Sequence, residues 1–142
     1  MKLASLRNGM RDGQLLVVSR DLSRALPVPH IAPNLQAALD DWARIVPRLE
    51  DASRALEDGP AAGGFPFQPT QVLAPLPRAH HWVDGSAYVN HVELVRKARG
   101  AEMPPTFWTD PLVYQGGSDD FLPPTADVAL PSEAHGIDLE AE

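Results

Sequence analysis

The chain has 142 residues and a formal net charge of −7, with 44% hydrophobic and 22% charged residues. This length allows one ordinary domain, or a small domain and the beginning of another, and the composition is globular rather than disordered. The sequence contains no cysteine, which excludes disulfides, thiolate metal sites, iron–sulfur clusters and a cysteine nucleophile.

The charges are unevenly distributed. Residues 1–100 carry 12 Lys and Arg against 10 Asp and Glu, whereas residues 101–142 carry no Lys or Arg and 9 Asp and Glu. An acidic region of this kind repels phosphate backbones, so we expect no nucleic-acid partner. The N-terminus does not resemble a signal peptide, and no stretch approaches the roughly 20 apolar residues of a membrane span. We therefore expect a cytoplasmic protein without a membrane partner.

The first 60 residues predict a β-hairpin followed by two helices. Residues 2–6 and 15–18 are strand-like and are separated by the turn pairs Asn-Gly and Asp-Gly. From Asn34, a helix-capping residue type, apolar residues recur at helical spacing up to Leu49. Pro47 lacks an amide hydrogen and crowds the preceding turn. We therefore expect one helix over 34–45 and another over 47–57.

The next segment, residues 59–78, is rich in proline and glycine with apolar residues between them. Such a segment is extended, cannot be a central strand, and is expected to pack against the rest of the protein. We place a domain boundary near residue 77, which gives one domain over 1–77 and a second unit over 78–142.

The sequence of the second unit predicts one helix between loops. Residues 86–99 have helical periodicity, end before Gly100, and carry basic residues in the last turn, where they complement the helix dipole. Residues 103–131 are loop-like, and residues 137–142 resemble the beginning of a strand. The predicted fold class is α+β, with a small N-terminal domain of barrel-like character.

Glu140 and Glu142 are candidate metal ligands. Side chains at positions i and i+2 of a strand point to the same face, so the two carboxylates would converge. Converging carboxylates repel each other unless a proton or a cation lies between them, and a divalent metal is the usual solution. The alternative is that both are solvated surface glutamates.

Asp84 and His91 form a second candidate pair. They are seven residues apart, close to two helical turns, so they share a face if the helix begins at Asp84. Histidine suits general base catalysis because it titrates near neutral pH. The alternatives are that Asp84 is only the N-cap of the helix and that His91 is a partly buried polar residue.

Three segments together resemble the fumarylacetoacetate hydrolase family, in particular its bacterial fumarylacetoacetase-like branch. They are Asp84–His91, Trp108–Gly116 and Asp138–Glu142. The resemblance extends over the whole chain, because residues 1–77 resemble the small N-terminal domain of this family. It implies that residues 78–142 begin a β-rich catalytic domain that continues after Glu142, so that the chain is an N-terminal fragment.

The resemblance implies hydrolysis of a carbon–carbon bond in a β-diketone acid, such as fumarylacetoacetate cleaved to fumarate and acetoacetate in tyrosine catabolism. Asp84, Glu140 and Glu142 would bind Mg²⁺ or Ca²⁺, and His91 would be the general base that activates water. Tyr114 would contact the substrate.

Arg96 and Arg99 are candidates for binding the substrate carboxylate, with solvated charges at a helix end as the alternative. The resemblance also implies a homodimer when the protein is complete. Two other functions stay open. One is an acylpyruvase, keto-acid decarboxylase or isomerase of the same family, and the other is a non-enzymatic binding or assembly module.

The resemblance places a fourth metal ligand and a catalytic lysine after Glu142. We therefore expect the 142-residue chain alone to have little or no hydrolase activity. The decrease in diketone absorbance of fumarylacetoacetate with added Mg²⁺ measures this activity. Turnover near the enzymatic median of about 10 s⁻¹ would contradict the expectation.

Overall fold

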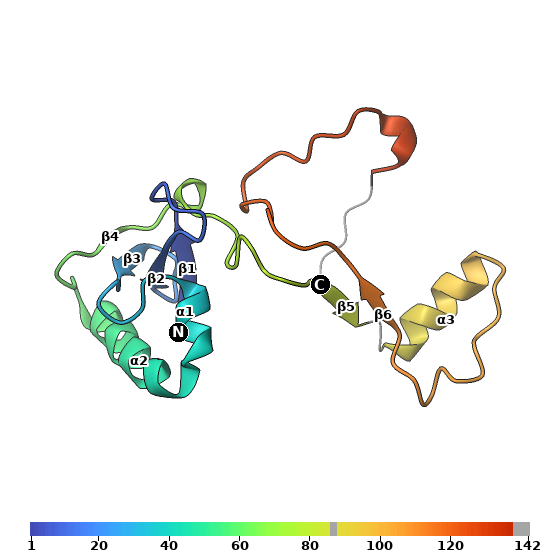
Figure 1. Ribbon diagram of the computed structural model, residues 1–142, viewed down its shortest axis with the longest axis horizontal. Helices are drawn as coiled ribbons and strands as arrows, with labels where there is room; N and C mark the ends of the chain where they lie inside the picture. The colour runs from blue at the N-terminus through green and yellow to red at the C-terminus, as the bar shows by residue number, and fades with distance from the viewer. Residues whose placement is uncertain (86–87, 138–142) are drawn as a thin grey trace.

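The computed structural model describes residues 1–85 and 88–137 (Figure 1). In the N-terminal part, four strands form one antiparallel sheet in the order β1-β2-β3-β4, and two helices come between β3 and β4 in the chain. The strands are β1 (Lys2–Leu6), β2 (Gln14–Val18), β3 (Arg24–Pro27) and β4 (Phe65–Pro66), and the helices are α1 (Leu35–Asp40) and α2 (Trp42–Asp58). The predicted α+β class is confirmed.

The predicted hairpin is also confirmed. Strands β1 and β2 pair from Lys2↔Val18 to Leu6↔Gln14. Gly13, where the turn leads into β2, has φ +66°, and a Cβ atom there would lie 2.7 Å from the carbonyl oxygen of Leu6. Only glycine adopts this conformation in this space without displacing the backbone.

The predicted helix break at Pro47 is wrong. The break lies at Asp41, whose φ of −133° and ψ of 42° are not helical, and α2 continues through Pro47 to Asp58. A proline inside a helix costs about 3 kcal/mol. Ile45 and Leu49, on either side of it, are almost fully buried, and each contributes roughly 1.5–3 kcal/mol. Burial on both sides of the proline therefore outweighs its cost.

The cap predicted for the first helix is correct. The side chain of Asn34 accepts a hydrogen bond from the backbone N–H of Ala37 at 2.8 Å, immediately before α1 begins at Leu35. This bond satisfies one of the amides that the first helical turn leaves without a partner.

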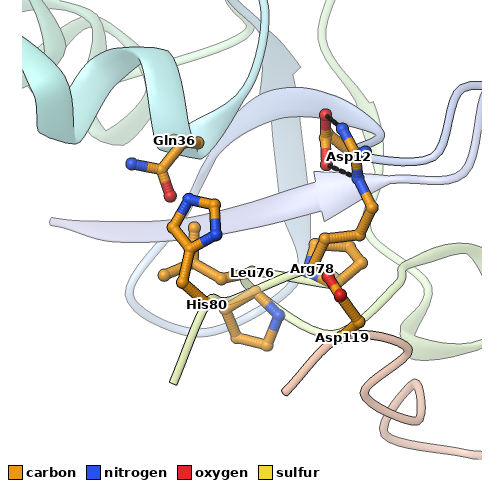
Figure 2. A pocket seen from close by; sticks show the side chains of 8 residues that line it. Asp12, Gln36, Leu76, Arg78, His80 and Asp119 are labelled. Carbon is orange, nitrogen blue, oxygen red and sulfur yellow. Dashed lines mark hydrogen bonds and ion pairs between the residues drawn. The ribbon is translucent and has the colours of Figure 1, made fainter. Parts of the chain in front are cut away.

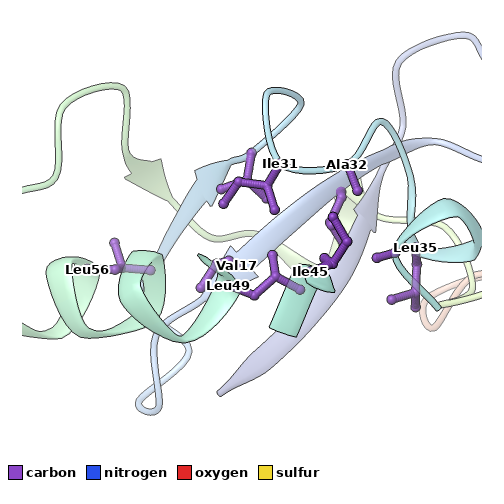
Figure 3. Packing of buried hydrophobic residues seen from close by; sticks show 10 residues of the cluster. Val17, Ile31, Ala32, Leu35, Ile45, Leu49 and Leu56 are labelled. Carbon is purple, nitrogen blue, oxygen red and sulfur yellow. The ribbon is translucent and has the colours of Figure 1, made fainter. Parts of the chain in front are cut away.

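The hydrophobic core lies on both faces of β2. Leu15 and Val17 pack in a cluster with residues of α1 and α2, which Figure 3 shows over the sheet. Leu16 and Val18 point the other way, as alternation in a strand requires, and pack in a second cluster with Val72. The proline-rich segment supplies the cover of this second face, as the sequence predicts.

The same proline-rich segment contacts both edges of the sheet. Strand β4 pairs with β3, and after the turn η1 (Pro69–Gln71) the chain reaches β1. There the N–H of Arg7 donates to the carbonyl of Gln71 at 2.9 Å, and the N–H of Leu73 donates to the carbonyl of Ser5 at 2.8 Å. These bonds give the sheet its predicted barrel-like closure.

The part after residue 78 contains β5 (Val83–Gly85), α3 (Val89–Ala98), β6 (Val113–Gln115) and the turn η2 (Glu133–His135). The predicted helix is confirmed, although it begins three residues later than expected. Of the strand predicted over 137–142, residues 138–142 lie outside the described residues. Among described residues after 80, only Val92 and Phe107 are buried.

No helix in the described ranges is long and apolar enough to span a membrane.

Two leucines test the position of the core. Leu49 of α2 is fully buried, whereas Leu39 of α1 is 43% exposed. Replacement of Leu49 by alanine should lower the free energy of unfolding by about 2–5 kcal/mol, and Leu39→Ala, the matched control, by less than about 1 kcal/mol. Denaturant titration followed by circular dichroism measures both. Equal losses would contradict the packing of α2 on β2.

Candidate functional site

Two of the predicted site residues face each other across a strand pair. Asp84 lies in β5 and Tyr114 in β6, and the antiparallel register pairs them directly. Residues in opposite positions of such a pair point to the same face, with Cβ atoms about 4.5–5.5 Å apart. Strand pairing thus brings together a predicted metal ligand and a predicted substrate contact that are 30 positions apart in the chain.

The condition for a shared helical face of Asp84 and His91, a helix that begins at Asp84, is not met. Asp84 belongs to a strand, and α3 begins only at Val89, with Tyr88 as its N-cap residue. Asp84 is therefore not the N-cap either. The backbone of residues 83–85 pairs with β6, so it is not available for a helix. His91 is exposed on α3, on a different element from the strand pair.

Trp82 is a member of the site that the sequence does not indicate. Its ring packs edge-on against Tyr114, with centroids 6.0 Å apart and an interplanar angle of 74°. Its carbonyl accepts a hydrogen bond from the N–H of Gly116 at 2.9 Å, and its own N–H donates to the carbonyl of Gly117 at 3.2 Å. The Trp82 ring therefore packs against one edge of the Tyr114 side chain. The Trp82 backbone extends the pairing of β5 with β6 by one residue.

Gly116 makes room for the Trp82 ring. A Cβ atom on Gly116 would lie 2.0 Å from Cε3 of Trp82, far inside van der Waals contact. This close approach of an aromatic ring to the backbone depends on the pairing of Gly116 with a residue distant in the chain.

The two predicted carboxylate-binding arginines lie at the end of α3. The Nη1 atom of Arg96 donates to the carbonyl oxygen of Glu102 at 3.0 Å, which ties the following loop to the helix. The backbone N–H of Arg99 bonds to carbonyls of the last helical turn, and its side chain is exposed. The substrate role predicted for both arginines stays a prediction.

A divalent cation suits the donor chemistry of the predicted ligands, because carboxylate oxygens are the ligands that Mg²⁺ and Ca²⁺ prefer. Within residues 1–85 and 88–137, however, no three His, Asp or Glu side chains come together to bind a metal. Glu140 and Glu142 lie outside the described residues. Asp84, half-buried in β5, is the only one of the three predicted ligands that the structure describes.

The four-stranded sheet with its two helices and closing segment defines a small α+β domain at the N-terminus. The family model "Fumarylacetoacetase N-terminal domain 2" matches residues 1–78. Because this match covers more than half of the chain, the chain belongs to the fumarylacetoacetase family through this domain. The resemblance seen in the sequence is thereby confirmed for the N-terminal portion. No curated protein matches the chain.

Two neighbouring glycines test the packing around Trp82. Gly116→Ala should displace the Trp82 ring and separate it from Tyr114, whereas Gly117→Ala should not, because a Cβ atom on Gly117 meets nothing within 4 Å. Nuclear Overhauser contacts between the two rings report the change. If both variants keep these contacts, the close approach of Trp82 to Gly116 is wrong.

Proposed function

We propose that this chain contributes to a metal-dependent hydrolase that cleaves a carbon–carbon bond in a β-diketone acid such as fumarylacetoacetate. Residues 1–77 are its N-terminal domain, and residues 78–142 belong to its catalytic domain. The membership of the N-terminal domain in the fumarylacetoacetase family supports the general class. The pairing of Asp84 with Tyr114 carries the proposal further, because the two come from separate motifs with different proposed roles.

Asp84 would bind Mg²⁺ or Ca²⁺ together with Glu140 and Glu142. When bound, the cation supplies Lewis-acid polarisation of the diketone oxygens. Strand β5 contributes by fixing the direction of one carboxylate, since a residue in a paired strand has little conformational freedom. The half-burial of Asp84 also strengthens its attraction for a cation, because water screens the interaction less than on an open surface.

Tyr114 would bind the substrate next to this carboxylate. Its side chain is 64% exposed, so its hydroxyl is accessible and can donate a hydrogen bond to a substrate oxygen. The edge-on contact with Trp82 limits the movement of the ring. A phenol held by its neighbour loses less entropy when it binds a ligand.

His91 would be the general base, and Arg96 and Arg99 would attract the substrate carboxylate. A base must lie within about 2.6–3.2 Å of the water that it deprotonates, directly or through one further water. His91 and Arg96 are on α3 and Arg99 is its C-cap residue, and this helix follows β5 in the chain. The proposal therefore requires α3 to lie beside the strand pair when substrate is bound.

Metal titration tests the proposal on the chain itself. Calorimetric titration with Mg²⁺ or Ca²⁺ should show binding that weakens by about ten- to a hundred-fold or more in Asp84→Asn and in Glu140→Ala, since each removes a proposed ligand. Glu50→Ala is the matched control, because Glu50 is exposed on α2 in the N-terminal domain. Equal binding by all four proteins would overturn the proposed metal site and favour an assembly module.

A second titration tests the substrate class. A β-diketone acid should bind in the presence of the metal, and Tyr114→Phe should weaken this binding while leaving metal affinity unchanged. Comparison with an acylpyruvate and a short keto acid distinguishes the fumarylacetoacetase-like reaction from the smaller-substrate reactions of the same family. Binding of the diketone acid that is unaffected by Tyr114→Phe would exclude the proposed contact.

A further inference from the structure

Arg78 connects the end of the N-terminal domain to the turn between β1 and β2. Its Nε donates to Oδ1 of Asp12 at 2.8 Å, and its Nη2 donates to Oδ2, so the guanidinium binds the carboxylate with two parallel bonds (Figure 2). The hydrogen bonds from Arg78 hold the pKa of Asp12 below its usual range, despite some desolvation. Both side chains are partly shielded from solvent, so this pair is screened less than an open surface pair.

A third segment, far along the chain, meets the same place. The backbone N–H of Asp119 donates to the carbonyl of Ala79 at 3.1 Å, and the N–H of Phe121 donates to the carbonyl of Pro77 at 3.0 Å. The carboxylate of Asp120 lies 3.7 Å from Nη2 of Arg11. This last pair is highly exposed and contributes little, so the contact rests on the two backbone bonds, whose acceptors Pro77 and Ala79 flank Arg78 in the chain.

The conformation of this third segment is costly on its own. Asp119 and Asp120 both have left-handed backbones, with φ of 56° and 54°. Aspartate tolerates this region better than most residues, but two in succession are uncommon and persist where surrounding contacts stabilise them. The negative charges of both residues also stabilise the positive charge of Arg78 and raise its pKa, after the larger effect of Asp12.

An apolar cavity borders the same interface. Leu122 and Pro124, both exposed, line this cavity, which has a volume of about 260 Å³. The N-terminal domain supplies the rest of its lining, from β1 and from the segment that closes the sheet: Leu3, Ala4, Val72, Leu73, Ala74 and Pro75. A second cavity, of about 180 Å³, lies between Arg78, Asp12 and Asp119 (Figure 2). Residues from the 119–124 segment and from the first 80 residues thus line the same two cavities.

The backbone bonds of this interface continue those of the candidate site. Strand pairing joins β5 to β6, then Trp82 bonds to Gly116 and Gly117, Ala79 to Asp119, and Pro77 to Phe121. Two chain segments therefore run side by side from the N-terminal domain to Asp84 and Tyr114. The far end of this ribbon carries the candidate site, and its near end lies at Arg78.

We propose that residues 119–124 are a strap that fastens the β5–β6 pair to the N-terminal domain, with Arg78 as its positioning residue. Arg78 binds the β1–β2 turn through Asp12 and attracts the aspartates of the strap. The strap thereby holds the two-segment ribbon in one direction relative to the domain. This role concerns the position of the strand pair and does not depend on the identity of the metal or the substrate.

Hydrogen exchange measured by nuclear magnetic resonance tests the strap in the 142-residue chain. In the wild-type protein, the amides of Asp119 and Phe121 should be protected, because they donate to the carbonyls of Ala79 and Pro77. Arg78→Ala should increase their exchange by about ten- to a hundred-fold, the range expected for a lost charged hydrogen bond. The amide of Val28, which bonds to Leu15 in the core, should keep its protection and so report an intact domain.

Two further variants separate a specific contact from general destabilisation. Arg78→Lys keeps the charge but not the two-pronged geometry, so it should give intermediate exchange. The double variant of Asp12→Asn with Arg78→Ala should exchange no faster than Arg78→Ala alone, because the two residues act as one unit. Arg44→Ala, the matched control, removes an exposed ion pair with Asp41 on α2 and should change nothing at Asp119 or Phe121.

Three results would overturn the strap. One is unchanged exchange at Asp119 and Phe121 in Arg78→Ala while Val28 stays protected. Another is the same increase in Arg44→Ala as in Arg78→Ala. The third is additive effects of the Asp12 and Arg78 substitutions, which would show that these residues do not work through their mutual contact.

Discussion

Burial of both faces of β2 is the constraint on which the N-terminal domain depends. Its residues Leu15 to Val18 are all buried, two on each side of the sheet. A single layer of helices covers only one face, so another part of the chain must cover the other. The proline-rich segment does this, and in doing so it passes β3, crosses to β1, and leaves the domain beside the β1–β2 turn. The position of Arg78 near Asp12 follows from this path.

The part of the chain after residue 80 has the opposite character. With only Val92 and Phe107 buried among its described residues, it has little core of its own, and an isolated two-stranded sheet is at best marginally stable. Backbone pairing alone gives β5 and β6 their register. Within the described residues, the contacts of residues 119–124 with the segment after the N-terminal domain give the pair a direction relative to that domain.

Local patterns in the sequence predict the hairpin and the Asn34 cap well, because both depend on neighbouring residues, and they predict that the proline-rich segment is extended and packed, but not what it packs against. They fail at Pro47, where burial of Ile45 and Leu49 outweighs helix propensity. They also fail at Asp84, since its strand exists only through pairing with residues 113–115. The meeting of Asp84 with Tyr114, and the part played by Trp82, are consequences of that long-range register and have no periodic signal. The predicted ligands Glu140 and Glu142 lie outside the described residues.

A carboxylate that binds a metal, or a phenol that binds a substrate, has to be held within about half an ångström of its working position. Strand pairing controls the distance between Asp84 and Tyr114, and the Trp82 ring limits the rotation of Tyr114, but neither controls where the pair points. In the proposed arrangement, fixing the ribbon at its near end supplies the missing restraint, because the backbone bonds between its two segments connect its base to its tip. In this proposal, the N-terminal domain positions the strand pair, although it supplies none of the proposed reacting groups.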